Sequence, residues 1–266
     1  MTYAIETFDL TKEFFPAKSL HRLILHPFQK EKSILAINNI SLQIRQGELF
    51  CLVGPNGSGK TTLIKILSCL ILPTKGRAKV CGYDILKEGG RVKSSIGLVS
   101  GDERSFYWRL TLRQNLCFYA LLYNLSQFEA KKKIEEVASL LEITPELDKR
   151  FQESSTGIKQ RLSIARSLLN NPQVLFMDEP TKSLDYAIAK DLRNFIKERL
   201  VREQKRTVVF ITHNLFEAED LAERIAIMYQ GQIRVCGALS ELCHKINSPL
   251  ATIEEIYERV TKEDIS

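Results

Sequence analysis

The segment LFCLVGPNGSGKTTLIKIL, residues 49–67, joins an unbroken apolar run, a glycine-rich segment and a second apolar pattern. The first five residues predict a strand covered on both faces, as in parallel sheets. The last part repeats apolar residues at helical spacing and predicts a helix. Between them, Gly54, Gly57 and Gly59 permit a tight turn whose N–H groups point inward, and the helix adds its positive end. This strand, loop and helix therefore predict a polyphosphate site.

Further apolar runs extend the prediction to a parallel sheet. VLFM at 174–177 and VVFI at 208–211 are as continuous as LFCLV at 49–53, so we expect these three strands at the centre of the sheet. By contrast, apolar and polar residues alternate over 40–44, which predicts a peripheral strand with one face in water. The sequence therefore indicates an α/β fold.

Helical patterns lie between these strands. Apolar residues recur on one face over 134–141, and Ser126 with Glu129 forms a capping box ahead of them. A second helix is expected over 188–200. Thr144 followed by Pro145 resembles an N-cap with a first-turn proline, so a new helix is expected there.

The interval from about Arg91 to Ser155 is mostly helical, and we interpret it as a lobe inserted into the α/β core. These helices could instead simply cover the sheet, because periodicity does not separate the two arrangements.

Composition excludes several classes. The 266 residues are 44% apolar and 26% charged, which argues against a disordered, collagen-like or disulfide-rich miniprotein chain. Apolar runs such as 66–72 fall well short of the roughly 20 residues that a membrane-spanning helix requires. The first ten residues lack the features of a secretory signal, so we expect a cytosolic chain. The six cysteines form no C-x-x-C pair and are expected to be free thiols without a metal. The net charge of +6 bears on solubility more than on any site.

Two segments suggest no chemistry. Residues 16–33 are basic with apolar residues at helical spacing, so they could touch a membrane or a partner. Pro16 and Pro27 keep any helix short and favour a surface loop. The tail from Ser240, with Ser240 and Thr252 as expected helix caps, is interpreted as a packing or docking extension.

The glycine loop and the strand at 174–177 supply the chemical groups of a nucleotide site. Lys60 is expected to reach the β and γ phosphates, and the Thr61 hydroxyl to bind Mg²⁺. Asp178 is expected to hold Mg²⁺ through its water shell, and Glu179 to accept a proton from the attacking water. The alternative is that both carboxylates only cap the next helix. His213 follows another buried strand and is expected to bond the γ phosphate, although lone histidines are usually structural.

Together these residues resemble the ATP-binding cassette (ABC) ATPase family from about Ile5 to Gln232. The diagnostic block is SSTGIKQRLSIARSLLNNPQVLFMDEP, residues 154–180. It contains a variant of the family signature L-S-G-G-Q, followed 21 residues after Gly157 by Asp178. The resemblance implies a P-loop NTPase (RecA-like) core, with a peripheral antiparallel β subdomain and a helical lobe at about 91–157. It also implies an ATPase domain over 1–240, which leaves 241–266 as a C-terminal helical extension.

The resemblance also implies site residues and partners. Two such domains would face head to tail, each ATP lying between one subunit's phosphate loop and the other's signature. The second subunit could be identical or different, and a separate transmembrane permease would place the pair at the cytoplasmic face of the membrane, with no nucleic acid expected. ATP-binding residues would be Phe14, Gly54, Pro55, Asn56, Gly57, Ser58, Gly59, Lys60, Thr61 and Thr62. The signature in trans would be Ser155, Thr156 and Gly157, the D-loop Ser183, Leu184 and Asp185, and the catalytic residues Glu179 and His213. For Phe14, an ordinary core position is the alternative to stacking on adenine.

The chain departs from the family pattern in two places. No glutamine stands where the family carries its Q-loop, and Asp102 or Glu103 could substitute at Mg²⁺. The signature has Thr156 for its first glycine and Ile158 for its glutamine. The wording ERSFYWRLT, residues 103–111, is similar to exporters whose ATPase is a separate chain, so export is favoured. Within it, Tyr107 and Trp108 could equally be core of the lobe.

Two other functions compete with a transporter subunit. A soluble ABC ATPase acting on ribosomes or DNA is the alternative, although the chain shows no second cassette and no nucleic-acid module. A P-loop kinase or GTPase leaves the signature block unexplained.

Overall fold

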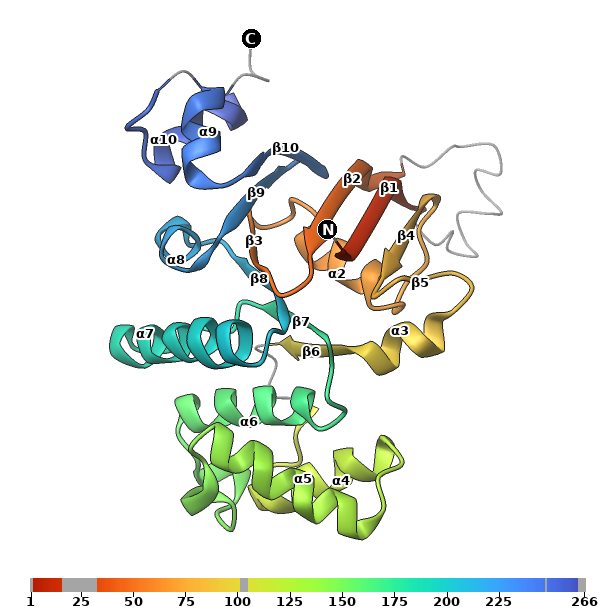
Figure 1. Ribbon diagram of the computed structural model, residues 1–266, viewed down its shortest axis with the longest axis vertical. Helices are drawn as coiled ribbons and strands as arrows, with labels where there is room; N and C mark the ends of the chain where they lie inside the picture. Colours follow the sequence, from red (N-terminus) through yellow and green to blue (C-terminus); the bar gives the residue numbers. More distant parts are fainter. Residues whose placement is uncertain (1, 16–32, 101–104, 247, 263–266) are drawn as a thin grey trace, which may run out of the picture.

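The computed structural model describes residues 2–15, 33–100, 105–246 and 248–262. At its centre lies a six-stranded sheet in the order β10-β9-β3-β8-β7-β6 (Figure 1). Neighbouring strands are parallel except β9 and β10, which are antiparallel. The three continuous apolar runs are the adjacent strands β3, β8 and β7, so their predicted central place is confirmed. The strands are β3 (Leu49–Val53), β6 (Ile96–Ser100), β7 (Val174–Asp178), β8 (Thr207–Thr212), β9 (Arg224–Tyr229) and β10 (Gln232–Gly237).

Strand β3 shows why such a run has no polar position. All five of its residues are buried, because alternate side chains enter two different apolar clusters. Phe50 and Leu52 pack in the cluster shared with the second sheet, and Leu49, Cys51 and Val53 pack in the cluster on the opposite face. Burial strongly raises the pKa of the Cys51 thiol, which keeps it protonated as an apolar group.

The second sheet is antiparallel, with the order β2-β1-β4-β5. In β2, Ile40, Leu42 and Ile44 are buried while Ser41 and Gln43 are exposed, which confirms the predicted strand with one wet face. Helix α2 (Lys60–Leu67) buries its apolar residues in the cluster shared by the two sheets. The strands are β1 (Tyr3–Phe14), β2 (Ile34–Arg45), β4 (Lys75–Val80) and β5 (Tyr83–Asp84).

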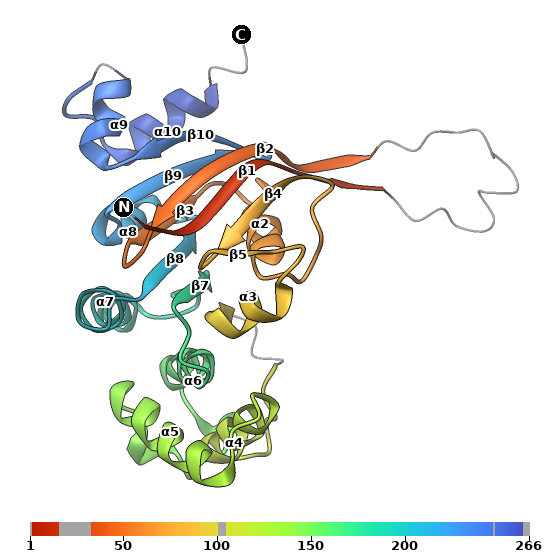
Figure 2. The same cartoon turned by 45° about the vertical axis from the view of Figure 1, so that its right-hand side comes forward.

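A helical lobe lies beyond one edge of the central sheet (Figure 2). It consists of α4 (Leu112–Leu122), α5 (Gln127–Leu140) and α6 (Thr156–Leu168), with short 3-10 turns at Thr144–Glu146 and Phe151–Glu153. The expected lobe of about 91–157 began too early. Strand β6 falls inside that range, and it belongs to the sheet because it pairs in parallel with β7, Ile96 opposite Val174. The lobe helices begin only at Leu112.

Two helix starts in the lobe gave different outcomes. Ser126 caps α5 as predicted, with both bonds of the capping box to Glu129 present. The helix expected at Thr144 is wrong, because this segment forms only the 3-10 turn, without a side-chain cap. The backbone N–H groups of Leu112 and Arg113 donate to Lys149 O and Leu147 O, which holds the segment against the start of α4.

The remaining helices are α3 (Gly89–Ser95), α7 (Tyr186–Phe195), a π-helical continuation at Ile196–Glu203, α8 (Leu215–Leu221), α9 (Leu239–Lys245) and α10 (Ile253–Lys262). The C-terminal helical segment begins at α9, before the expected boundary at 241. Ser240 therefore lies inside α9 and is not a cap, whereas Thr252 accepts from Glu255 N at 3.3 Å, ahead of α10. Within the described ranges, no helix is long and apolar enough to cross a membrane.

Candidate functional site

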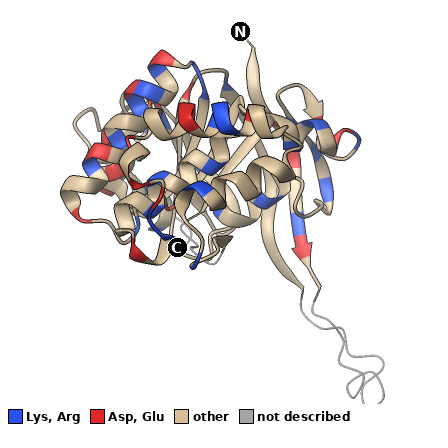
Figure 3. Ribbon diagram, turned by 90° about the horizontal axis from the view of Figure 1, so that it is seen from below, with Lys and Arg blue, Asp and Glu red and all other residues tan. Residues whose placement is uncertain are grey.

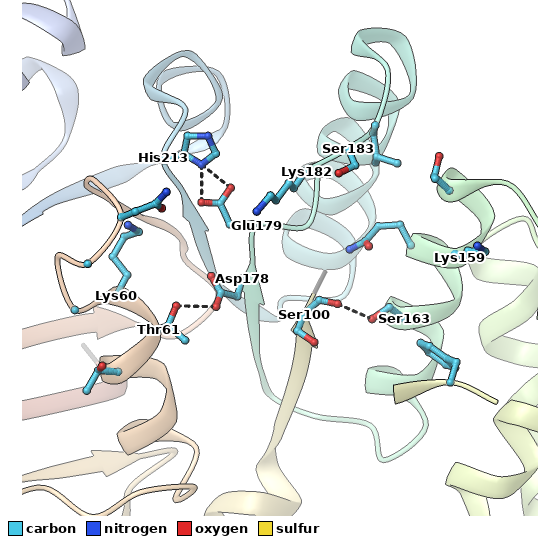
Figure 4. Close-up of a pocket in the computed structure, with 18 of the residues that line it drawn as sticks. Lys60, Thr61, Ser100, Lys159, Ser163, Asp178, Glu179, Lys182, Ser183 and His213 are labelled. Carbon is cyan, nitrogen blue, oxygen red and sulfur yellow. Dashed lines mark hydrogen bonds and ion pairs between the residues drawn. The ribbon is translucent and has the colours of Figure 1, made fainter. Parts of the chain in front are cut away.

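The site lies where the carboxyl ends of the four parallel strands β3, β8, β7 and β6 meet. Register places Val53 beside Thr212, and Asp178 beside both Ile211 and Ser100. A cleft of about 670 Å³ opens there, between the glycine loop and helix α6 (Figure 4). Of the predicted site residues it brings together Asn56, Gly57, Gly59, Lys60, Thr61, Thr62, Thr156, Asp178, Glu179, Ser183, Leu184 and His213.

The glycine loop passes so close to its neighbours that side chains are excluded. Gly59 has φ +105°, and a Cβ there would lie 2.4 Å from the carbonyl oxygen of Ala36. At Gly54 a Cβ would lie 2.1 Å from Met228 O. These distances are far below contact, so both positions require glycine for packing, and the positive φ of Gly59 also favours glycine.

Lys60 begins α2 and points back into the loop. Its Nζ donates to Gly54 O at 2.7 Å and to Pro55 O at 2.9 Å. Burial lowers the pKa of Lys60, while Glu179 and Asp178 oppose that shift. The ammonium is therefore held where an incoming phosphate would replace neutral carbonyls with charged acceptors.

Thr61, in the first turn of α2, and Asp178, at the end of β7, form an oxygen pair. The Thr61 hydroxyl donates to Asp178 Oδ2 at 3.0 Å. Burial raises the pKa of Asp178, and the bond from Thr61 acts in the opposite direction. A hydroxyl and a carboxylate side by side are hard oxygen ligands, of the kind that Mg²⁺ prefers.

Glu179 and His213 form a second pair. His213 Nδ1 lies 2.7 Å from Glu179 Oε1 and 2.8 Å from Oε2 (Figure 4). Glu179 has φ +53°, an uncommon conformation that is compatible with a constrained functional position. The alternative that Asp178 and Glu179 cap the next helix is wrong, because α7 starts at Tyr186 with Asp185 as its N-cap residue.

Of the predicted signature and D-loop residues, Thr156, Ser183 and Leu184 line the cleft. Ser155 is the N-cap of α6 and accepts from Ile158 N at 3.4 Å, and both Ser155 and Thr156 are exposed. A Cβ on the buried Gly157 would lie 3.1 Å from Ile188 Cγ2, so this glycine lets α6 approach α7. Ser183 and Asp185 are also exposed.

The remaining predictions lie at the edge of the cleft or beyond it. Phe14 ends β1 with 40% of its surface exposed and Lys12 Nζ 5.0 Å from its ring centroid, so the core alternative is wrong. Phe14 does not line the cleft. Tyr107 and Trp108 are half exposed, so they are not lobe core either. Asp102 and Glu103, the candidates for the missing glutamine, lie outside the described residues, as does the segment 16–32.

Sequence reasoning missed several cleft residues. Lys182 lies beside Glu179, and Lys159 and Ser163 of α6 face them from the other side (Figure 4). Gln160 of α6 also lines the cleft. Ser100, which accepts from Ser163 Oγ at 3.5 Å, ends β6. Its place at the carboxyl end of a parallel strand was the available signal, since such ends form the site in open α/β sheets.

A phosphate-holding loop on a parallel sheet, with an acidic pair ending the neighbouring strand, defines a P-loop nucleoside triphosphatase. Comparison with known proteins narrows this class. A family model described as ABC transporter matches residues 37–182, more than half of the chain. The chain belongs to this ABC family as an ATP-binding subunit of a transporter, and it is an ATPase.

Individual relatives agree with this assignment. ABC transporter ATP-binding protein NatA of Bacillus subtilis (strain 168) is 34% identical over 89% of this chain and 90% of that protein. Methionine import ATP-binding protein MetN of Geobacillus kaustophilus (strain HTA426) is 35% identical over 85% of this chain and 66% of that protein. The dimeric cassette MJ0796 bound to ADP and Pi superposes with a TM-score of 0.74 at 27% identity, covering 88% of this chain and 98% of that chain.

Proposed function

We propose that this chain dimerises on binding Mg²⁺ and ATP and that hydrolysis drives a separate transmembrane permease, in the direction of export. The observation that carries this proposal is the convergence of Lys60, the Asp178–Thr61 pair and the Glu179–His213 pair at one end of the sheet. These groups suffice to hold a triphosphate and to activate water, and the exposed Ser155 and Thr156 remain available to a partner.

Each residue then has a role. Amides of residues 54–62 and the Lys60 ammonium hold the phosphates, and the exposed Phe14, outside the lining of the cleft, stacks on adenine. Thr61 and Asp178 fit Mg²⁺ as oxygen ligands, and the ion when bound neutralises charge between the phosphates. Glu179 accepts a proton from the attacking water, and His213, held by Glu179, bonds the γ phosphate.

A second subunit completes the site, whether identical or different. Ser155 and the first amides of α6 supply donors at a helix start, where the dipole favours a phosphate. These groups are exposed, as are Ser183 and Asp185 of the proposed D-loop. The dimer described for MJ0796 supports this arrangement. ATP therefore stabilises the closed pair more than the separate subunits, which is the differential affinity that a switch requires.

A permease partner would place the chain at the cytoplasmic face of the membrane, with residues 1–240 as its ATPase domain. Acidic and basic residues are interspersed along the helices (Figure 3). The proposed direction rests on the exporter-like wording of residues 103–111. MetN is named for import, which makes import the competing direction.

The test is affinity purification of the full chain from detergent-extracted membranes. We expect a polytopic protein to co-purify and to change the ATPase rate of the chain; rRNA or DNA in its place would support the soluble alternative. For direction, deletion of the gene should raise sensitivity to a toxic compound if the system exports. Slower growth on one limiting nutrient would indicate import.

A further inference from the structure

A buried polar chain connects helix α7 to the end of strand β8. Arg193 of α7 donates from Nη1 to Glu217 Oε1 and from Nε to Asp220 Oδ2, both at 3.2 Å. Glu217 of α8 accepts through its other oxygen from Thr212 Oγ1 at 2.8 Å. The side chains of Arg193 and Glu217 are only 8% and 11% exposed, and Thr212 is 1% exposed. We call Arg193, Glu217 and Thr212 the buried polar chain.

Such a chain has little freedom in its geometry. A buried charge is costly unless it is paired and hydrogen-bonded, so Arg193 and Glu217 hold each other in place. Both Glu217 oxygens are used, one by Arg193 and one by Thr212. A displacement of α7 would therefore move Arg193 and Glu217 and so change the position of Thr212.

Thr212 immediately precedes His213, and its hydroxyl acts on both sides of that residue. Besides donating to Glu217, Thr212 Oγ1 accepts from Asn214 N at 3.0 Å. Asn214 in turn caps α8, where its Oδ1 accepts from Phe216 N at 3.1 Å. The backbone at His213 is thus fixed between the end of β8 and the start of α8, with the ring 2.7 Å from Glu179.

The other end of the buried polar chain leads toward the surface that we propose to face the partner subunit. Helix α7 begins directly after Asp185, and Arg193 lies about two turns along it. The exposed Ser183 and Asp185 are the residues that we assign to the D-loop. One rigid helix therefore separates the proposed dimer contact from the polar chain behind His213.

We propose that Arg193, Glu217 and Thr212 are positioning residues that hold His213 against Glu179 and link its orientation to helix α7. This inference rests on the proposed roles of Glu179 and His213. The polar chain itself touches no nucleotide, so weakening it should lower kcat and leave the KM for ATP nearly unchanged.

Glu217→Gln, Arg193→Met and Thr212→Val test the chain, and Glu48→Gln is the matched control. Glu48 is 3% exposed, pairs with Arg224 at 3.1 Å and accepts from Arg45 N, but it precedes β3 at the end away from the cleft. Both Gln variants should lower the thermal midpoint, because Glu217→Gln removes the buried carboxylate that pairs with Arg193 and leaves it only Asp220, and Glu48→Gln removes the buried carboxylate that pairs with Arg224. Only the chain variants should lower kcat, by about tenfold, a part of the 10²–10⁴ that acid–base catalysis supplies. Thr212→Ser, which keeps the hydroxyl, should restore it.

A second measurement reads the geometry directly. The ¹⁵N signal of His213 Nδ1 should shift in the chain variants, because its bond to Glu179 is disturbed, and should stay in place in Glu48→Gln. Unchanged kcat and ¹⁵N signal in folded Glu217→Gln and Thr212→Val, or equal loss of kcat in Glu48→Gln, would overturn the inference. If the native chain itself does not hydrolyse ATP, the proposed function fails, and the His213 signal still decides the inference.

Discussion

Lys60 shows how a single residue is prepared for its ligand. Its donors are occupied by the carbonyls of Gly54 and Pro55, with Ser58 Oγ further away at 3.5 Å. Burial lowers the pKa of Lys60, and the nearby Glu179 and Asp178 only partly oppose that shift. A triphosphate would offer charged acceptors in place of neutral ones, and charge-assisted bonds are roughly twice as strong.

Replacement of this lysine tests the phosphate loop. We expect Lys60→Ala to weaken ATP binding by about 10- to 100-fold, from the ~1.5–3 kcal/mol of a hydrogen bond to a charged group. Titration calorimetry measures the affinity. Lys79→Ala, at an exposed position on β4, is the control and should bind ATP normally. Unchanged affinity in Lys60→Ala would remove the assignment of the loop.

The carboxylate of Glu179 has a different test, because it acts on water and not on binding. Glu179→Gln should keep ATP affinity and lower turnover by roughly 10²–10⁴, the usual contribution of a general base. The variant should therefore accumulate an ATP-bound dimer, visible by light scattering alongside phosphate release. A normal rate would place the base elsewhere.

The residues of the site were predictable where they belong to a motif of consecutive residues. Lys60, Thr61 and Asp178 fall in the cleft as the sequence indicated. Lys182 and Ser100 were missed because their places depend on strand register and on the path of the loop after β7, which no local pattern encodes. For Phe14, stacking on adenine and an ordinary core position both stayed open, because the local pattern does not distinguish a buried strand end from an exposed one.

At the scale of elements, helix α6 carries the proposed signature at its first turn. Ser155 caps the helix, and Gly157 allows its close packing on α7 at Ile188. The unpaired N–H groups of a helix start and its dipole both favour an anion. The start of α6 is therefore where a substitution should disturb a shared site without disturbing the core.

Ser155→Arg should abolish most ATP hydrolysis, because it places a long cation where a partner's phosphate is proposed to dock. Loss of the cap should cost only about 1 kcal/mol of stability. Ser126→Arg is a matched control: Ser126 caps α5 in the lobe through the same type of bond. Both variants should show a similar drop in thermal midpoint, and retained ATPase activity in Ser155→Arg would contradict the shared site.

Elements with a strong period or a complete cap were predictable, and those set by distant contacts were not. Helix α5 satisfies both halves of its capping box, and the strands β3, β7 and β8 are continuous apolar runs. Thr144 and Pro145 match the residue types of a helix start, yet they form only a 3-10 turn, and the carbonyls of Leu147 and Lys149 just after it accept from the first residues of α4. The edge strand β6 was absorbed into the expected lobe because its sheet partner, β7, is distant in the sequence.

At the scale of the whole molecule, the helical lobe lies beyond one edge of the central sheet (Figure 1). The glycine loop and helix α6 of this lobe line one cleft. In the proposed dimer, a nucleotide on the loop of one subunit faces the signature on the lobe of the other. The sequence predicted the α/β core with an antiparallel sheet and a lobe, but the start of the lobe depended on where the sheet ends.

This arrangement predicts a mass that depends on nucleotide and metal. Millimolar Mg²⁺ and ATP should shift Glu179→Gln from monomer to dimer in light scattering, and EDTA should return it to monomer, because Thr61 and Asp178 then lose their proposed ion. Native protein should show a smaller and transient shift as hydrolysis proceeds. A mass that stays constant in both proteins would exclude the composite pocket.

The two apolar clusters have a bearing on how the chain matures. Strands β3, β7 and β8, which all end at the cleft, each contribute side chains to both clusters. The catalytic ends of these strands can therefore come into register only when the two halves of the interior have both condensed. We therefore expect nucleotide binding to require that both apolar clusters are packed. A nascent or damaged chain in which one cluster is unpacked should not hydrolyse ATP.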